Sequence, residues 1–449
     1  MFTDKFNKAS HMISNTLQVI ENRSRNVAIV EYQGRVIGAM GCIIIAILPK
    51  SKVGDLCQII DQEISLKLFA EVVAIENDEI KLLPFGSIDN ISTRAIVYKV
   101  SEGFMIKVGD FLLGQIVDGL GNLITKPEQI TNEQLYPLFN HAPDPLKRKI
   151  IIEPLLTGVK AIDLFITCGR GQRLAIFAGP GMGKTTLLSM IIGNAQADVI
   201  VIALIGERGR EVNEFIELDL NKEARKKCII IVATSERPPV EQVKAAYVAQ
   251  TIAEYFRDLG KNVILFVDSI TRFARAQREV GLSAGEPIAR GGFPPSVFSA
   301  FSRLMERAGN NELGTITAFY TVLMEGEDTT RDPIADEVRS IIDGHILLSK
   351  KLVEIGHFPA INILASLSRV ADRIISSSHM LNARKVRMLL SKFEELEFLL
   401  RVGEYKEGND PIADEAIKKN RAINKFLQQS TYEQVNFDYC VSQLASLAN

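Results

Sequence analysis

Short hydrophobic runs, separated by glycine and charged turn residues, fill the chain between residues 26 and 100. Their sequences are NVAIVEY, GCIIIAIL, DLCQII, LFAEVVAIE, EIKLLPF and RAIVYKV. Short β-rich runs at near-regular spacing are typical of a small closed β-barrel. The pattern therefore predicts a barrel domain at residues 25–98, after a polar and weakly helical segment at residues 1–24.

The middle of the chain alternates uncharged, strand-like runs with helical stretches. The runs are RLAIFAG, DVIVIALIG, CIIIVAT, NVILFVD and GTITAFYTVL. Such β-branched runs predict strands covered on both faces, as in a parallel sheet built from βαβ units. Helices are expected at residues 184–195, 241–259 and 296–308. A stretch rich in Pro, Gly and Asn around VDGLGNLITKPEQI predicts a linker, and the α/β domain as a whole is placed at residues 99–375.

The strand pattern stops after about residue 376. Residues 383–400 then have apolar positions at a spacing of three to four, which predicts an amphipathic helix. These positions are Val386, Leu389, Leu390, Phe393, Leu396 and Leu400. The predicted fold class is therefore an α/β core with a small N-terminal β-barrel and a C-terminal α-helical domain at residues 376–449.

Composition excludes several classes of protein. The 449 residues are 47% hydrophobic and 24% charged, with a formal net charge of −2. These values are typical of a soluble globular protein and argue against a surface for nucleic acid. The longest uncharged apolar run, at residues 38–49, is shorter than the roughly 20 residues that cross a bilayer. Five scattered cysteines favour buried thiols in a reducing compartment, so we expect a cytoplasmic protein.

One glycine-rich segment carries the strongest chemical signal. It reads FAGPGMGKTTLL between a strand-like run and a helix, which is the setting of a phosphate-binding loop. Glycines let backbone N–H groups turn toward an anion, Lys184 adds positive charge for the β- and γ-phosphates, and the Thr185 hydroxyl is a Mg²⁺ ligand. Ala178 replaces the first glycine of the generic pattern, and Gly179 directly after it supplies the same backbone freedom. The predicted nucleotide-binding residues of the loop are Gly179, Pro180, Gly181, Met182, Gly183, Lys184, Thr185 and Thr186.

Two other strand ends carry acidic residues that complete such a site. NVILFVD ends in Asp268, which is placed to hold Mg²⁺ directly or through water. ALIGE ends in Glu207, the candidate general base, because a carboxylate at the carboxyl end of a parallel strand faces the ligand crevice. Arg208 is expected either to contact the γ-phosphate or to anchor its loop. Glu211 is a candidate for the Mg²⁺ shell, with a structural ion pair as the alternative.

Longer motifs carry a family resemblance. PAINILASLS, at residues 359–368, fits the signature of rotary ATP synthase α/β subunits and their relatives. IGERGREVNEF, GEPIARGGFPPSVFS and PIADEVRSIIDGHILLS resemble the protein-export branch of that family, which comprises the flagellar export ATPase and the type III secretion ATPase of injectisomes. ALIGERGREVNEF, AEYFRDLGKNV and FLQQST are most similar to the injectisome member, and this branch commonly has alanine at the position of Ala178.

The resemblance implies an N-terminal β-barrel, a RecA-like ATPase domain, a C-terminal helical domain and a homohexamer with ATP and Mg²⁺ between neighbours. Lys184, Thr185, Glu207, Arg208 and Asp268 match the family's phosphate, magnesium and catalytic positions. Two further matches come from the resemblance alone. They are the arginine finger for the adjacent subunit, Arg369, and the aromatic side chain that stacks on adenine, Phe358.

The resemblance also implies partners: a central stalk, stator proteins, chaperone–effector complexes and an export gate at the inner membrane. It implies a loop into the hexamer pore at residues 279–295, for which an ordinary interface loop is the alternative. We therefore expect a cytoplasmic hexameric ATPase, peripheral to the inner membrane, that energises type III secretion. Four other functions stay open: a flagellar export ATPase, a rotary ATP synthase subunit, a non-catalytic nucleotide-gated docking ring and, less favoured, an RNA translocase.

Overall fold

The computed structural model describes residues 33–449 except for residues 87, 89–90, 128–129, 131 and 325–331. The chain divides into two compact units, Met1–Glu102 and Gly103–Asn449. The expected lead-in at residues 1–24 and the run at residues 26–32 lie outside the described residues.

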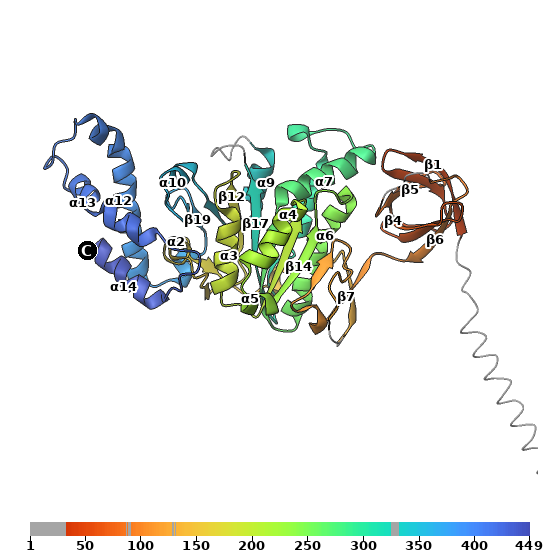
Figure 1. The fold of residues 1–449 in the computed structure, drawn as a ribbon, viewed down its shortest axis with the longest axis horizontal. Helices are drawn as coiled ribbons and strands as arrows, with labels where there is room; N and C mark the ends of the chain where they lie inside the picture. The colour runs from red at the N-terminus through yellow and green to blue at the C-terminus, as the bar shows by residue number, and fades with distance from the viewer. Residues whose placement is uncertain (1–32, 87, 89–90, 128–129, 131, 325–331) are drawn as a thin grey trace, which may run out of the picture. The chain divides into compact units, whose positions relative to one another are not determined.

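The first unit contains a closed barrel with the strand order β1-β2-β5-β4-β3-β6 (Figure 1). Its strands are antiparallel, and β1 closes the ring by pairing with β6. Alternating side chains such as Ile44, Ile59 and Val72 fill the interior. The strand bounds are β1 Gln33–Met40, β2 Ile43–Ile47, β3 Leu56–Asp61, β4 Leu66–Glu76, β5 Glu79–Pro84 and β6 Ile96–Ser101.

The second unit is built on a largely parallel sheet of nine described strands with the order β19-β18-β12-β17-β15-β13-β14-β8, and β16 pairs with β17. The strands at its centre are almost wholly buried, because helices cover both faces. Their bounds are β8 Ile116–Asp118, β12 Arg173–Ala178, β13 Val199–Ile205, β14 Cys228–Ala233, β15 Asn262–Asp268, β16 Gly309–Asn310, β17 Thr315–Leu323, β18 Gly344–Leu347 and β19 Leu367–Ser368. Two small antiparallel pairs lie beside the sheet, β7 (Met105–Val108) with β9 (Gln134–Pro137) and β10 (Pro154–Leu155) with β11 (Cys168–Gly169).

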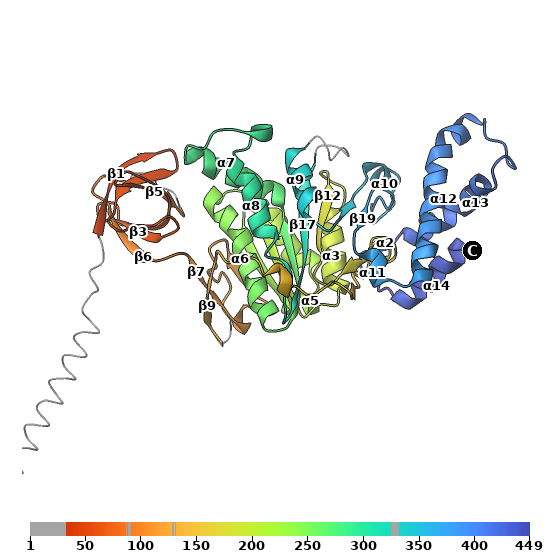
Figure 2. The same ribbon diagram turned by 180° about the vertical axis from the view of Figure 1, so that it is seen from behind.

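The helices form one layer on each face of this sheet, as Figures 1 and 2 show from opposite sides. One layer consists of α6 Pro239–Asp258, α7 Ile270–Ser283, α8 Pro295–Met305 and α9 Pro333–Ile341. The other contains α2 Lys160–Phe165, α3 Lys184–Asn194, α4 Gly209–Glu214 and α5 Lys222–Lys226. Short helices α10 Lys350–Glu354 and α11 Ala371–Ile374 flank the last strand.

The C-terminal region consists of helices, as predicted. They are α12 Ser377–Val402, α13 Pro411–Leu427 and α14 Phe437–Ala448. The helix expected at residues 383–400 is longer at both ends, because Ser376 caps its N-terminus and Gly403 ends it in the left-handed conformation. In the described part of the chain, every helix is too short or too polar to cross a membrane.

The predicted fold class is confirmed, and one detail of the sequence analysis is wrong. The stretch that begins at Val117 was expected to be a linker. Instead, β8 adds to the edge of the central sheet by pairing in parallel with β14. Three residues are too short for a periodic signal, and the strand ends in an Asp-Gly pair that is a strong turn signal, which explains the error.

Candidate active site

The glycine-rich segment connects β12 to α3, so it lies at the carboxyl edge of the sheet. Gly181 and Gly183 have positive φ values of 73° and 82°, which a residue with a Cβ adopts only with strain. Gly183 is the N-cap of α3, and no side chain caps that helix. The first amides of α3 therefore face the site together with the positive end of the helix dipole, as anion binding requires.

Met182 behaves differently from the other residues of the loop. Its side chain is buried, and its sulfur accepts the N–H of Gly179 at 3.2 Å. A Cβ on Gly179 would lie 2.7 Å from the Met182 methyl carbon. The loop thus packs on its own methionine, and Met182 does not line the cavity that its neighbours line.

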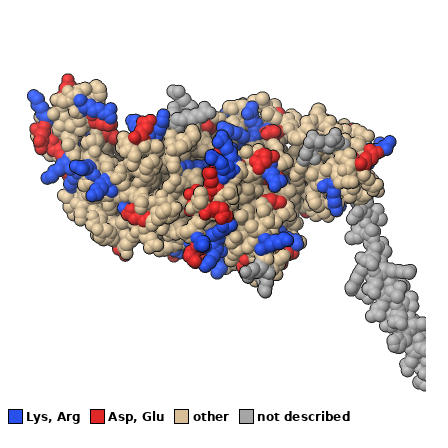
Figure 3. Space-filling model, viewed as in Figure 1, with Lys and Arg blue, Asp and Glu red and all other residues tan. Residues whose placement is uncertain are grey.

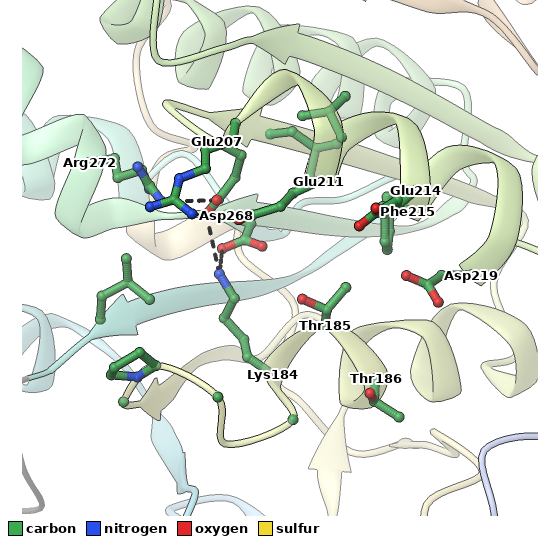
Figure 4. Close-up of a pocket in the computed structure, with 18 residues that line it drawn as sticks. Lys184, Thr185, Thr186, Glu207, Glu211, Glu214, Phe215, Asp219, Asp268 and Arg272 are labelled. Atoms are coloured by element: carbon green, nitrogen blue, oxygen red, sulfur yellow. Dashed lines mark hydrogen bonds and ion pairs between the residues drawn. The ribbon is translucent and has the colours of Figure 1, made fainter.

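The lysine predicted from the glycine-rich loop and the two carboxylates predicted from strand ends meet in one place (Figure 4). Lys184 Nζ lies 2.5 Å from Asp268 Oδ1 and 3.4 Å from Glu207 Oε1. Asp268 ends β15 and Glu207 follows β13, and both side chains are buried. Parallel strands bring their carboxyl ends to one edge, which explains why residues far apart in sequence converge here.

Two residues that the sequence analysis missed hold these carboxylates. Arg272, in the first turn of α7, donates to Glu207 Oε2 at 2.9 Å and to the carbonyl oxygen of Gly206 at 2.6 Å. The Thr321 hydroxyl on β17 donates to Asp268 Oδ1 at 2.6 Å. The sequence contained a signal for Arg272, because it lies one helical turn after the strand-end aspartate. Nothing in the strand run GTITAFYTVL distinguishes Thr321 as a residue of the site.

Burial and charge shift two pKa values in this cluster. Burial raises the pKa of Glu207, and Asp268 raises it further, while Lys184 and Arg272 oppose the shift. Burial disfavours the charged form of Lys184, but the Asp268 and Glu207 carboxylates outweigh it and raise the pKa of the ammonium. Lys184 therefore stays charged, and Glu207 is a stronger base than an exposed glutamate.

A cavity of about 580 Å³ opens above this cluster. Thr185 and Thr186 line it on the side of α3, opposite Glu214 and Asp219 (Figure 4). Arg208 also lines it, but 75% of its side chain is exposed and it pairs with Glu211 at 3.4 Å. Charges over the face drawn in Figure 3 are mixed in sign.

Phe358 lies at the other side of the loop, in a second hollow with the segment 428–430 that follows α13. Its ring is 43% exposed and comes within 3.8 Å of the position that a Cβ on Gly183 would take. The carbonyl oxygen of Phe358 accepts the N–H of Gln429 at 2.9 Å. An exposed aromatic face beside the phosphate-binding loop is suited to stacking on a base.

Arg369 does not join the cluster within one chain. It follows β19, and its backbone N–H donates to the carbonyl oxygen of Asp343 at 2.9 Å. Arg369 therefore lies level with Arg173, the first residue of β12. At about 3.3 Å per residue, the start of β12 is roughly 16 Å from Ala178 and the loop. Arg369 is exposed and does not line the 580 Å³ cavity.

The residues present fit a Mg²⁺–nucleotide. The donor set combines backbone amides at a helix N-terminus, a lysine, a threonine hydroxyl and a strand-end carboxylate. Oxygen ligands of this kind are those that Mg²⁺ prefers, together with phosphate oxygens of the nucleotide. Lys184 makes ion pairs with the Asp268 and Glu207 carboxylates. A bound phosphate would compete with these carboxylates for the Lys184 ammonium. The fold and this site together define a P-loop nucleotide-binding enzyme.

Comparisons with known proteins give the family. The model of the ATP synthase alpha/beta family nucleotide-binding domain matches residues 158–368, and that of the T3SS EscN ATPase C-terminal domain matches residues 375–446. The chain is 45% identical to the type 3 secretion system ATPase of Sinorhizobium fredii, covering 93% of this chain and 92% of that protein. It is 46% identical to the flagellum-specific ATP synthase of Bacillus subtilis, with 92% and 94% covered.

Among solved structures, the assembled ATPase EscN in complex with its central stalk EscO, from enteropathogenic Escherichia coli, has a TM-score of 0.86 and 47% identity. It covers 93% of this chain and 100% of that one. The chain belongs to the family of type III secretion and flagellum-specific ATPases. It is accordingly a nucleotide-binding ATPase, as the sequence analysis predicted.

Proposed function

We propose that this chain hydrolyses ATP at sites shared between neighbouring subunits of a homohexamer, and that this reaction energises type III protein secretion. The observation that carries the proposal is the division of the site. One chain brings together Lys184, Asp268 and Glu207, whereas Arg369 lies at the other end of the sheet. The arginine of one subunit can therefore complete only the site of another.

Each residue has a role that follows from its position. The amides of residues 181–186 and the Lys184 ammonium bind the phosphates, and Phe358 stacks on the adenine. Glu207 accepts a proton from the water that attacks the γ-phosphate, and Arg272 orients its carboxylate. Arg369 of the neighbour stabilises charge that builds on the γ-phosphate.

Binding of ATP also removes the ion pair seen between Lys184 and the carboxylates. When Lys184 turns to the phosphates, Asp268 loses its closest cation, whereas Glu207 keeps its ion pair with Arg272. Asp268 is then available to the Mg²⁺ that accompanies ATP, with the Thr185 hydroxyl as second ligand. Mg²⁺ supplies charge neutralisation on the phosphate oxygens. Glu211 is a weaker candidate for this shell, because it pairs with Arg208 on the exposed rim.

Two observations support the proposed assembly and its cellular place. The EscN relative was solved in an assembled form and with a central stalk. This chain matches its length and fold closely, so we assign to it a ring, a stalk partner and, beyond these, stator proteins and an export gate at the inner membrane. The C-terminal helices α12 to α14 are assigned to recognition of chaperone–effector complexes, and the loop at residues 279–295 to the pore.

A flagellar export ATPase is the second candidate, because the flagellum-specific relative is as similar as the secretion relatives. The two functions separate in a strain that lacks this chain. We expect loss of effector secretion, restored by the wild-type gene and not by a Glu207→Gln variant. Loss of motility with normal effector release would contradict the secretion role and support the flagellar one.

A further inference from the structure

The hollow that contains Phe358 has a second wall, which comes from the C-terminal helices. This wall is the segment 428–433, in the connection between α13 and α14. The hollow has a volume of about 340 Å³, and we call it the base hollow; its lining residues are Gly356, Phe358, Gln428, Gln429, Ser430 and Glu433. An aromatic ring stacks on only one face of a base, so the position of the segment 428–433 decides how far the base is enclosed.

Gln429 joins the two walls of the base hollow. It is buried, with 5% of its surface exposed, whereas Gln428 and Ser430 on either side of it are exposed. Its backbone N–H donates to the carbonyl oxygen of Phe358 at 2.9 Å. The main chain of the segment is therefore bonded directly to the residue that is suited to stacking on a base.

The side chain of Gln429 bonds to the start of α2, which lies beside α14 in both views (Figures 1 and 2). Its Nε2 donates to the carbonyl oxygens of Gly158 at 2.7 Å and Glu433 at 3.2 Å. Its Oε1 accepts the N–H of Lys160, the first residue of α2, at 3.0 Å. Val159, the N-cap of α2, gives no side-chain cap, so Gln429 supplies the acceptor that this helix end needs.

An ion pair strengthens the same connection. Lys160 Nζ lies 2.6 Å from Glu433 Oε1, and the Lys160 side chain is only 14% exposed. Lys160 Nζ also donates to the carbonyl oxygen of Gln428 at 3.3 Å. The other carboxylate oxygen of Glu433 accepts the N–H of Ser430 at 3.2 Å. The segment 428–433 is thus bound to the start of α2 through both its main chain and its side chains.

The turn that receives these bonds is itself held firmly. The buried Asp163 carboxylate accepts the N–H groups of Thr157 and Gly158 at 2.8 and 2.9 Å. An added Cβ on Gly158 would lie 2.3 Å from the Cβ of Asn194, so the turn packs closely on the last residue of α3. Because α3 begins at the phosphate-binding loop, the same helix supports both the phosphate site and the second wall of the base hollow.

The two N–H groups and the oxygen of the Gln429 side chain each have a backbone partner, so Gln429 acts through the segment that it holds. Loss of this amide leaves buried backbone groups without those partners, which costs more than the bonds themselves contribute. We propose that Gln429 is a positioning residue for the adenine of ATP, which fixes the segment 428–433 so that the base is enclosed opposite Phe358. This inference rests on the proposed function, in which Phe358 stacks on the adenine.

The test compares two ligands in ATPase assays of the full chain, at protein concentrations where activity per chain has reached its plateau. ATP carries a base, whereas Mg²⁺–tripolyphosphate carries only phosphates and competes for the phosphate-binding loop. For Gln429→Leu, KM for ATP is expected to rise by about tenfold, with kcat within about twofold of wild type, because only uniform binding is lost. The inhibition constant of tripolyphosphate is expected to stay within about twofold, because separate sites contribute independently.

The matched control is Gln434→Leu. Gln434 is an exposed glutamine in the same connection between α13 and α14, and it does not line the base hollow. KM, kcat and the inhibition constant are all expected to keep their wild-type values in this variant.

A second variant keeps the buried amide of Gln429 in place. Lys160→Gln removes the ion pair with Glu433 and keeps the backbone N–H that Gln429 accepts. Lys160 does not line the base hollow, so an effect on KM reports the position of the segment. KM for ATP is expected to rise about threefold, the scale of one partly exposed ion pair, with inhibition by tripolyphosphate unchanged. Thermal melting by circular dichroism checks the fold, and Lys160→Gln carries the test if Gln429→Leu does not fold.

Phe358→Ala separates this inference from the proposed function. A raised KM for ATP in Phe358→Ala, with an unchanged KM in the folded Gln429→Leu or Lys160→Gln variant, overturns the role of Gln429 and leaves the stacking intact. An unchanged KM in Phe358→Ala contradicts the stacking, and the role of Gln429 falls with it.

Two further results would also overturn the inference. Parallel losses of affinity for ATP and tripolyphosphate in Gln429→Leu would mean that Gln429 supports the phosphate-binding loop or the fold as a whole. A lower kcat at an unchanged KM would mean that Gln429 affects the chemical step and not the binding of the base.

Discussion

The two ends of β12 differ in how their charges are satisfied. At the carboxyl end, Lys184 contacts Asp268 and Glu207, and Arg272 contacts Glu207, so each of these four charges has a partner in the same chain. At the sheet edge formed by β18 and β19, Arg369 has no ion pair with a described residue.

This difference indicates which surface is complete and which requires a partner. A buried cluster with balanced charge can fold and bind nucleotide in a single chain. An edge where Arg369 lacks a counter-charge among the described residues is stabilised when an anion binds there.

Replacement of Arg369 by alanine is expected to have the largest effect. A trans arginine contributes about 10³ to 10⁵ in turnover for phosphoryl transfer, so hydrolysis is expected to become nearly undetectable. Nucleotide binding by the isolated chain and its melting temperature are expected to persist, because Arg369 is exposed and distant from the loop. Release of inorganic phosphate measures hydrolysis, and titration with a fluorescent ATP analogue measures nucleotide binding. Retained hydrolysis would show that Arg369 is only a surface residue.

Replacement of Glu207 by glutamine is expected to lower turnover by about 10² to 10⁴, the range for loss of a general base. The amide has the same shape but does not accept the proton. The matched control is Glu211→Gln, since Glu211 lines the same cavity but pairs with Arg208 on the exposed rim. An exposed pair contributes about 0 to 1 kcal/mol, so this control is expected to stay within a fewfold of wild type. Equal losses in both variants would contradict the assignment of the base.

Replacement of Arg272 by glutamine is expected to have a smaller effect with its own pH signature. Arg272 orients Glu207 and lowers its pKa, against the larger effect of burial. The base acts in its ionised form, so activity falls as pH drops through its pKa. Without Arg272 that pKa rises, and the acidic limb of kcat/KM is expected to move to higher pH. Arg272→Lys keeps the positive charge, so the acidic limb of kcat/KM is expected to lie between its wild-type position and its position in Arg272→Gln. A lower rate with an unmoved limb would mean that Arg272 has only a structural role.

The sequence was sufficient for the fold class and for the residues that strand ends and a glycine-rich loop bring together. Lys184, Asp268 and Glu207 could be placed because parallel strands deliver their carboxyl ends to one edge. Arg272 was missed because it orients another side chain and belongs to no loop motif considered. Thr321 was missed because a threonine inside a buried strand is ordinary.

Other features depend on contacts between distant segments, which a single sequence does not contain. β8 joins the central sheet through three residues, and Arg369 reaches Asp343 only because β19 pairs with β18. The packing of Met182 beneath its own loop likewise arises from the turn geometry. The motif indicated that the loop binds phosphate and left the role of this methionine open.

The division of the active site between neighbours is tested most directly by the ATPase activity of the purified wild-type chain as a function of protein concentration. If Arg369 of one subunit completes the site of another, activity per chain is expected to rise with concentration and to reach a plateau when rings are fully formed. Activity per chain that is high at the lowest concentration, in samples shown by light scattering to be monomeric, would contradict the shared site.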